Sequence, residues 1–196
     1  MYNRFSSILL TILTIAAITT TVSAQPTIYL VRHAEKLPTW LAEELADFHP
    51  LSDAGVGRAQ RLAEQFKIGS LAAIFSSRTT RTLHTALPLA QKLGLAVEIA
   101  EACSDTSAID SFYAALRQRF KPDQAVLLVS HSNIIPYLLR RAGLPDGCHQ
   151  EMGFKPLTED GWLVIEGYDN IWRVDRVGWK GRGCDSFTRK KFVMRQ

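Results

Sequence analysis

The stretch Thr27–Lys36, TIYLVRHAEK, decides the fold, because a short apolar run passes directly into a cluster of charged and polar residues. Ile28 and Leu30 favour strands, and such a run is typical of a strand covered on both faces in a parallel sheet. Arg32 and His33 follow where this strand ends. In open α/β sheets, ligands bind outside the carboxyl ends of the strands. The position therefore favours a binding site, although an Arg-His pair taken alone is also typical of a solvated turn.

Strands and helices alternate along the chain to about residue 140. Apolar runs predict further strands at 71–75, 95–99 and 125–129. Apolar residues at helical spacing predict helices at 56–66 after the N-cap Ser52, at 83–93 before Gly94, and at 109–120. This alternation predicts right-handed βαβ units. The expected fold is α/β, with a mostly parallel sheet flanked by helices on both faces in three α/β/α layers.

Two segments fall outside this alternation. Residues 37–50 predict an ordered loop or short helix, placed to form a flap over the site. The tail around Trp162, Trp172 and Trp179 predicts strands that complete or cover the sheet edge.

The length of 196 residues, with 46% hydrophobic and 21% charged residues, fits one globular domain. Residues 1–24 predict a secretory signal peptide, because Arg4 precedes an apolar run and Val22-Ser23-Ala24 suits cleavage before Gln25. A membrane anchor is less favoured, since the run is short and contains threonines. We therefore expect a single domain over 25–196, a periplasmic or secreted location, and no stable membrane anchor after cleavage.

Export makes disulfides possible for the three cysteines. We favour a bond between Cys148 and Cys184, with Cys103 free, and no cysteine or histidine has zinc-site spacing. The net charge of +4 falls to +3 when Arg4 leaves with the signal peptide, which suits an anionic substrate. The basic run 189–191 favours a solvated end of the chain, so no nucleic-acid partner is expected.

Three polar clusters follow predicted strands: Arg32-His33, Ser77–Arg81 and Ser130–Asn133. Because the carboxyl ends of parallel strands share one edge, these clusters are expected to meet there as an anion site. Arginine offers a planar fork of donors that matches phosphate oxygens, and the start of a helix adds backbone donors. A neutral histidine can attack phosphorus, while a second histidine and the arginines stabilise the transferred group. This chemistry requires no metal and no cofactor.

Four motifs resemble the histidine phosphatase superfamily, which includes the phosphoglycerate mutase-like enzymes. They are Arg32-His33-Ala34-Glu35, Leu51-Ser52-x-x-Gly55-x-x-Arg58-Ala59, Ser77-x-x-x-Arg81-x-x-x-Thr85-Ala86 and Val129-Ser130-His131-Ser132-Asn133. Tyr168-Asp169-Asn170-Ile171 also resembles the entry to a late strand in small bacterial members. The resemblance implies a phosphoglycerate mutase-like fold and a metal-independent phosphatase that hydrolyses a small phosphomonoester.

The resemblance also implies roles for individual residues. His33 would be phosphorylated transiently, Arg32 and Arg81 would bind the phosphoryl group, and His131 would stabilise it. The proton donor is left open between Glu101, Asp105 and neither of them; both lie in the region where many members carry it.

Other residues near these motifs have weaker claims. Ser132 stands where the acid-phosphatase and phytase branch has Asp, so the chain does not resemble that branch. Glu35 is expected to pair with a basic side chain, and His84 to lie on the surface or pack in its helix. Asn133 is expected either to cap the helix near Pro136 or to bind substrate.

Alternatives from other classes remain. The chain can be read as a non-catalytic phosphate or phosphosugar binding protein on the same fold, although binding alone would not need both His33 and His131. A phosphomutase is less favoured, because no large insertion is present to shield the site from water. The H-x-E of a zinc deaminase is also present in His33-Ala34-Glu35, but its P-C-x-x-C partner is absent.

Overall fold

The structure is a computed structural model that describes residues 25–40, 43–156, 161–175 and 183–192. The predicted signal peptide, residues 1–24, lies outside the described residues, and so does Trp179. In the part of the chain that the structure describes, no helix is both long enough and apolar enough to cross a bilayer.

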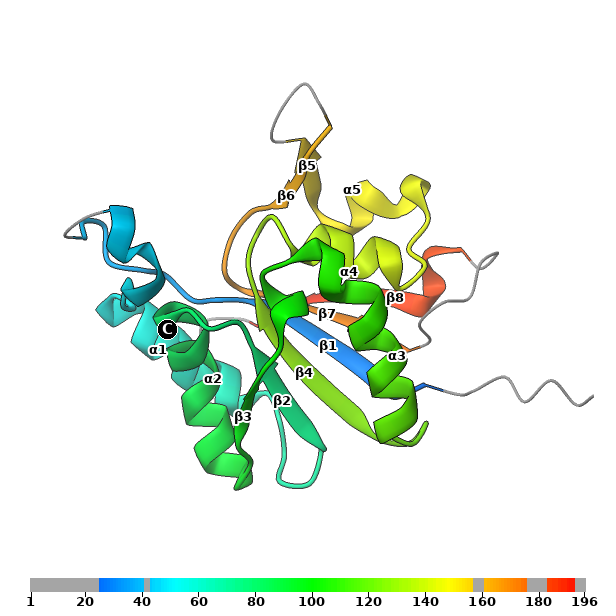
Figure 1. Ribbon diagram of the computed structural model, residues 1–196, viewed down its shortest axis with the longest axis horizontal. Coiled ribbons are helices and arrows are strands. Elements are labelled where there is room, and N and C mark those ends of the chain that lie inside the picture. The colour runs from blue at the N-terminus through cyan, green and yellow to red at the C-terminus, as the bar shows by residue number, and fades with distance from the viewer. Residues whose placement is uncertain (1–24, 41–42, 157–160, 176–182, 193–196) are drawn as a thin grey trace, which may run out of the picture.

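A six-stranded sheet forms the centre of the fold, in the order β3-β2-β4-β1-β7-β8 (Figure 1). The strands are β1 (Thr27–Arg32), β2 (Ala73–Ser76), β3 (Val97–Ile99), β4 (Ala125–Ser130), β7 (Asn170–Val174) and β8 (Phe187–Lys191). Strands β1 to β4 are parallel, as predicted, whereas β7 and β8 pair antiparallel at one edge. A separate hairpin pairs β5 (Phe154–Pro156) with β6 (Leu163–Ile165). The tail therefore completes the sheet edge, as expected.

Helices cover both faces of the sheet (Figure 1). The α-helices are α1 (Asp53–Glu64), α2 (Thr80–Leu93), α3 (Ile109–Arg119), α4 (Ile135–Arg141) and α5 (His149–Met152). Short 3₁₀ helices are η1 (Glu43–Phe48), η2 (Glu101–Cys103), η3 (Thr106–Ala108), η4 (Asp146–Cys148) and η5 (Cys184–Ser186). The predicted three-layer α/β fold is confirmed.

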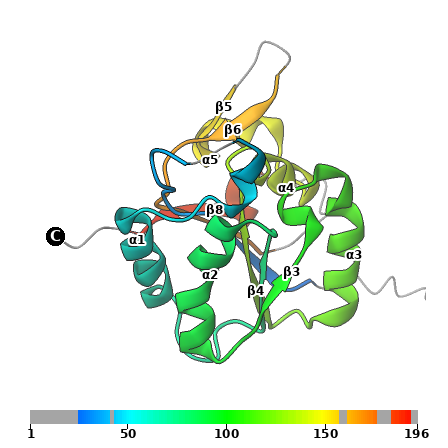
Figure 2. The same cartoon turned by 60° about the vertical axis from the view of Figure 1, so that its left-hand side comes forward.

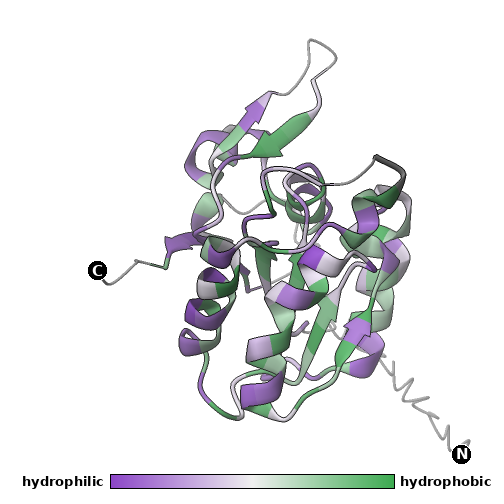
Figure 3. Ribbon diagram, turned by 90° about the vertical axis from the view of Figure 1, so that its left-hand side faces the viewer, coloured by the Kyte–Doolittle hydropathy of each residue, from purple (hydrophilic) through white to green (hydrophobic). Residues whose placement is uncertain are grey.

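Two buried clusters show why the central strands are apolar throughout. Leu127 of β4 packs with α1 and α2, while its neighbour Leu128 packs with α3 and α4. Successive strand residues point to opposite faces, so a strand covered on both sides needs apolar residues in a continuous run. Figure 3 shows this distribution, with hydrophobic strands inside and hydrophilic positions on the outer helix surfaces.

Local signals at the helix ends act as predicted. The Ser52 hydroxyl caps α1 by accepting a hydrogen bond from Gly55 N at 3.2 Å. Gly94 ends α2 in the left-handed conformation, with φ of 67°, which suits glycine because it has no side chain. Val56 was expected on the apolar face of α1 but lies 46% exposed, because the stripe that packs begins at Gly55 and continues through Ala59 and Leu62.

The disulfide prediction is confirmed. Cys148 in η4 and Cys184 in η5 form a disulfide bond, which ties the segment after α4 to the start of β8. Cys103 is buried and is a free thiol.

Candidate active site

The strand register brings the three polar clusters to one edge of the sheet. Arg32 at the end of β1 lies opposite Ser130 of β4, and Ser76 of β2 lies opposite Val129. The His33 backbone N–H donates to the Ser130 carbonyl at 2.9 Å, which extends the pairing by one step beyond the strand. The residues that follow β1, β2 and β4 therefore lie together at the carboxyl edge of the sheet, as the sequence predicted.

His33 is held in a defined tautomer. Its Nδ1 lies 2.8 Å from the Ala34 carbonyl oxygen, which can only accept, so Nδ1 carries the proton and Nε2 keeps its lone pair. Only 5% of the residue is exposed. Burial, together with the positive charges of Arg32 and Arg81, lowers the pKa of His33 from 6.5 to about 4, although the Ala34 hydrogen bond opposes this shift. The result is a neutral imidazole held in a defined orientation.

His131 lies beside His33, with ring centroids 5.4 Å apart. Its Nε2 is 2.9 Å from the Ser77 hydroxyl, which also contacts the Thr82 hydroxyl at 2.8 Å. Burial and the nearby Arg81 lower the pKa of His131 from 6.5 to about 3, so this ring is also neutral. His131 is thus in the site, as predicted, whereas its contact with Ser77 was not predicted.

Arg32 has one guanidinium nitrogen without a partner in the described part of the chain. Its Nη1 donates to the Gly167 carbonyl at 3.2 Å, and its Cζ lies 4.1 Å from the centre of the Tyr168 ring. Its Nε is buried and makes no hydrogen bond within the described residues. A buried unpaired donor is costly unless a ligand satisfies it. Arg32 is thus held in place and can still offer a hydrogen bond to an anion.

Arg81 lies in the first turn of α2 and contacts the predicted flap. Its Nη1 donates to the Ala46 carbonyl in η1 at 2.7 Å. Figure 2 shows the segment after β1 passing over the start of α2. The flap prediction is thus supported by a direct contact between residues 43–48 and a predicted phosphate-binding arginine.

Thr85 joins the loop after β1 to α2. Its hydroxyl accepts from the Ala34 backbone N–H at 2.9 Å and donates to the Arg81 carbonyl at 2.7 Å. This position appeared in the sequence only as part of a motif. The structure shows that it bridges the loop after His33 and the turn that carries Arg81.

Glu35 pairs with Arg58, as expected of a structural acid. The two side chains form hydrogen bonds at 2.5 to 2.8 Å. Partial burial acts to raise the pKa of Glu35, but the hydrogen bonds from Arg58 hold it below its usual value, so the carboxylate stays charged. A Cβ at Gly55 would collide with the Glu35 carbonyl oxygen, which explains the glycine in the first turn of α1. This ion pair anchors the loop that carries His33.

Tyr168 is a site residue that sequence reasoning missed. Its ring stacks on Arg32, its hydroxyl lies 3.4 Å from Arg32 Nη2, and its ring centre is 6.0 Å from that of His33. The sequence marked it only as the entry to a strand, because its contact with β1 depends on the antiparallel pairing of β7.

The remaining predicted site residues lie in turns after the strands. Glu101 begins η2, with an exposed carboxylate 3.6 Å from Arg78. Asp105 caps η3 by accepting from Ser107 N at 2.8 Å, and hydrogen bonds from Ser107 lower its pKa. Asn133 is exposed and gives no side-chain cap to α4, so the capping alternative is wrong. None of these three contacts His33 or His131 through a hydrogen bond within the described residues.

No group of three or more histidine, cysteine, aspartate or glutamate side chains that could hold a metal ion is found over the described ranges. The independence from metal therefore stays a prediction.

Both active-site histidines are expected to remain neutral down to about pH 5. The unfolded ring takes up a proton near pH 6.5, but folded His33 does so only near 4. The stability gained by burying the neutral ring is therefore complete above pH 6.5 and lost as the pH falls through about 4. An NMR titration of the His33 ring signals should give a midpoint near pH 4, and a midpoint of 6 or higher would contradict it. His33→Gln should make the free energy of unfolding less dependent on pH.

The fold and the site together define a class of protein. The mostly parallel α/β sheet is the phosphoglycerate mutase-like fold of the solved structures described below, and two histidines and two arginines follow its strands at the carboxyl edge. Residues 28–108 match the sequence profile of the histidine phosphatase superfamily (branch 1). The resemblance seen in the motifs is confirmed over these residues. No curated protein matches the chain.

Solved structures share the fold at low sequence identity. A protein assigned as the phosphohistidine phosphatase SixA, from Agrobacterium tumefaciens, is 21% identical with a TM-score of 0.57, covering 84% of this chain and 95% of that one. The protein histidine phosphatase SixA in complex with tungstate is 16% identical with a TM-score of 0.55, covering 84% and 94%. A mycobacterial glucosyl-3-phosphoglycerate phosphatase is 17% identical with a TM-score of 0.52, covering 85% and 96%. These similarities establish the fold.

Proposed function

We propose that this protein is a secreted or periplasmic phosphatase that hydrolyses a small phosphomonoester through a phosphohistidine on His33. The observation that carries the proposal is the hydrogen bond from His33 Nδ1–H to the Ala34 carbonyl, because it leaves Nε2 as a buried, neutral nucleophile beside Arg32 and Arg81. The solved structures that share the fold include phosphatases of different substrates, which supports phosphoryl hydrolysis without selecting a substrate.

The reaction has two steps. In the first, Nε2 of His33 attacks phosphorus, the bond from phosphorus to the ester oxygen breaks, and the leaving oxygen takes a proton. In the second, water attacks the phosphohistidine, the P–N bond breaks, and inorganic phosphate leaves while His33 becomes neutral again; the acid that protonated the leaving oxygen takes back a proton from the attacking water. Arg32 and Arg81 hold the phosphoryl oxygens in both steps, since fixed positive charge stabilises the spread of negative charge in the transition state. His131 would help to stabilise the phosphoryl group through its Nδ1, which makes no hydrogen bond within the described residues.

Glu101 suits the role of proton donor better than Asp105. The Asp105 carboxylate caps η3, and its lowered pKa disfavours the protonated form that a donor needs. Glu101 begins η2, and Cys103 ends it. The Cys103 carbonyl accepts a hydrogen bond from the Ser130 hydroxyl at 2.7 Å, so η2 packs at the sheet edge where His131 follows β4.

The choice of donor can be tested with two leaving groups. Glu101→Gln should lower kcat for an alkyl phosphate by about 10²-fold, because a poor leaving group needs a proton. The same variant should leave kcat for an aryl phosphate nearly unchanged, because the aryl leaving group is stable as an anion. Asp105→Asn is the matched control and should change neither rate. A drop with Asp105→Asn alone would assign the role to Asp105, and equal losses with both substrates would show that Glu101 is not the donor.

The location is part of the proposal. The Cys148–Cys184 disulfide supports an oxidising compartment, in agreement with the predicted signal peptide. Cleavage before Gln25 would be seen as a mature N-terminus by mass spectrometry of the exported protein, and a mature chain that keeps residues 1–24 would contradict it.

The test of the function is phosphate release by the mature chain, Gln25 to Gln196, from an aryl phosphate with EDTA present. The aryl substrate tests the nucleophile without depending on the donor. Release in EDTA supports metal-independent histidine chemistry. Absence of release across pH 4 to 8, by folded protein that binds phosphate, would favour the non-catalytic phosphate or phosphosugar binding protein. Transfer of the phosphoryl group to a second substrate molecule instead of water would favour a phosphomutase.

A further inference from the structure

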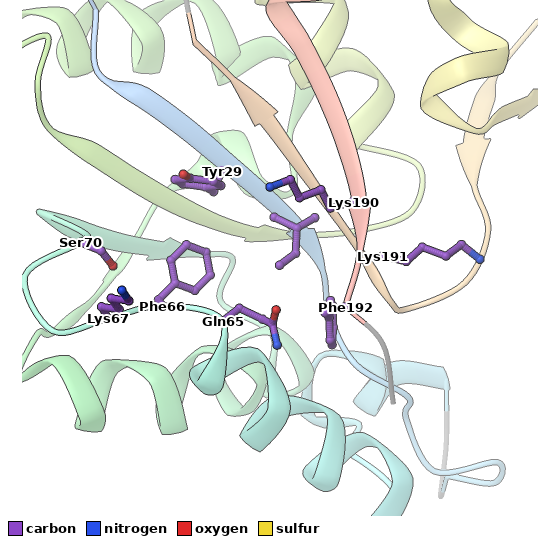
Figure 4. Close-up of a pocket in the computed structure, with 9 residues that line it drawn as sticks. Tyr29, Gln65, Phe66, Lys67, Ser70, Lys190, Lys191 and Phe192 are labelled. Carbon is purple, nitrogen blue, oxygen red and sulfur yellow. The ribbon is translucent and has the colours of Figure 1, made fainter. Parts of the chain in front are cut away.

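A pocket of about 350 Å³ lies between the end of α1 and the β7–β8 side of the sheet (Figure 4). Its lining residues come from β1, from the segment 65–70, from β7 and from the end of β8. Segment 65–70 leads into the amino end of β2, whereas His33 and His131 follow the carboxyl ends of their strands. The pocket is therefore separate from the catalytic site, and its volume falls in the range of small-molecule sites.

Aromatic and aliphatic side chains form much of the pocket wall. Tyr29 and Phe66 pack edge to face, with ring centroids 5.1 Å apart and an angle of 85° between the rings. Ile171 and Phe192 add further apolar surface. Helices α1 and α2 cover β1, β2 and β4 on this face, so Ile171 of β7 lies where the helical cover ends. A flat apolar ring can pack against such a surface.

The charged residues that line the pocket are all lysines. They are Lys67, Lys190 and Lys191, and no aspartate or glutamate is among the lining residues. Lys191 pairs with Asp169 at 3.5 Å and extends away from the pocket in Figure 4, whereas Lys190 extends toward Tyr29. Neither Lys67 nor Lys190 forms an ion pair within the described residues. Two ammonium groups thus flank an apolar wall without a carboxylate to neutralise them.

We propose that this pocket binds a small organic anion made of a flat apolar ring system and one carboxylate, sulfonate or phosphate group. The ring would displace water from the half-buried side chains of Tyr29 and Ile171, and the anionic group would lie between Lys67 and Lys190. A neutral ligand would leave both ammonium groups unpaired, and an inorganic anion would leave the apolar wall in water. The proposal does not depend on the phosphatase function.

The probe is 8-anilinonaphthalene-1-sulfonate, titrated by fluorescence into the mature chain with excess inorganic phosphate present to occupy the catalytic site. We expect saturable binding at one site. Lys190→Glu should weaken binding by about tenfold or more, since it replaces an attraction with a repulsion. Lys67→Glu should also weaken binding of the probe. Lys121→Glu is the matched control, because it makes the same charge change at an exposed lysine in the turn after α3, on the other face of the sheet, and should have no effect.

Two further measurements locate the binding and identify its chemistry. The neutral analogue N-phenyl-1-naphthylamine should bind about tenfold more weakly than the sulfonate. The backbone amides whose NMR chemical shifts change most on binding should lie in segment 65–70 and β8. Equal binding of the neutral analogue, equal loss with Lys121→Glu, or shifts centred on His33 would each overturn the proposal. Binding that requires a dimer in sedimentation would show instead that the pocket receives a second copy of the chain.

Discussion

Phosphate release by His33→Ala is expected to fall by at least about 10³-fold relative to the native sequence, which is the scale on which enzymes lose activity without their nucleophile. His131 is expected to stabilise the phosphoryl group and not to attack it, because its Nε2 already contacts the Ser77 hydroxyl. The variant should also fail to form the acid-labile phosphoenzyme that brief mixing with substrate gives in the native protein. The measurements are initial rates with an aryl phosphate, and trapping of the labelled phosphoenzyme in alkaline detergent, with loss of the label on later acid treatment.

His84→Ala is the control for this experiment. His84 lies on α2, one turn beyond Arg81, and its side chain is exposed, so it reports on the general cost of removing an imidazole. It should keep nearly full activity and the same melting temperature as the native protein. If His33→Ala stays folded and active within a few fold, the phosphohistidine route is wrong. Water attack assisted by His131 would then have to be considered.

Much of the fold was predictable because its signals are local. The parallel strands β1, β2 and β4 are buried on both faces and so read as continuous apolar runs. Ser52 and Gly94 marked helix ends through chemistry that acts within a few residues. The convergence of His33 and His131 followed from a topological rule, since polar residues after parallel strands share one edge.

The contacts that were not predicted join residues far apart in the sequence. Tyr168 reaches Arg32 because β7 pairs antiparallel with β1, and nothing local marks the direction of that strand. The contact between Ser77 and His131 depends on the relative twist and level of β2 and β4. Glu101 and Asp105 lie in short turns whose shape comes from packing, so the sequence left the donor open, and only the capping contact of Asp105 separates the two.

Removing the disulfide by Cys148→Ser with Cys184→Ser is expected to lower the free energy of unfolding by about 4 kcal/mol. The two cysteines are 36 residues apart, and closing a loop of this length restricts the unfolded chain by about that amount. For a domain of this size the melting temperature should fall by about 10 °C. Activity at 25 °C should change little, because the bond joins η4 to η5, while His33, Arg81 and His131 follow the parallel strands β1, β2 and β4.

The reductant dithiothreitol separates the disulfide from the free thiol. It should lower the melting temperature of the native sequence and have no effect on the double variant. Cys103→Ala should respond to the reductant like the native chain, because buried Cys103 lies outside the disulfide. Oxidised protein, once unfolded, should titrate one thiol per chain. Three titratable thiols in exported protein would contradict both the bond and the oxidising location, since the two predictions rest on the same chemistry.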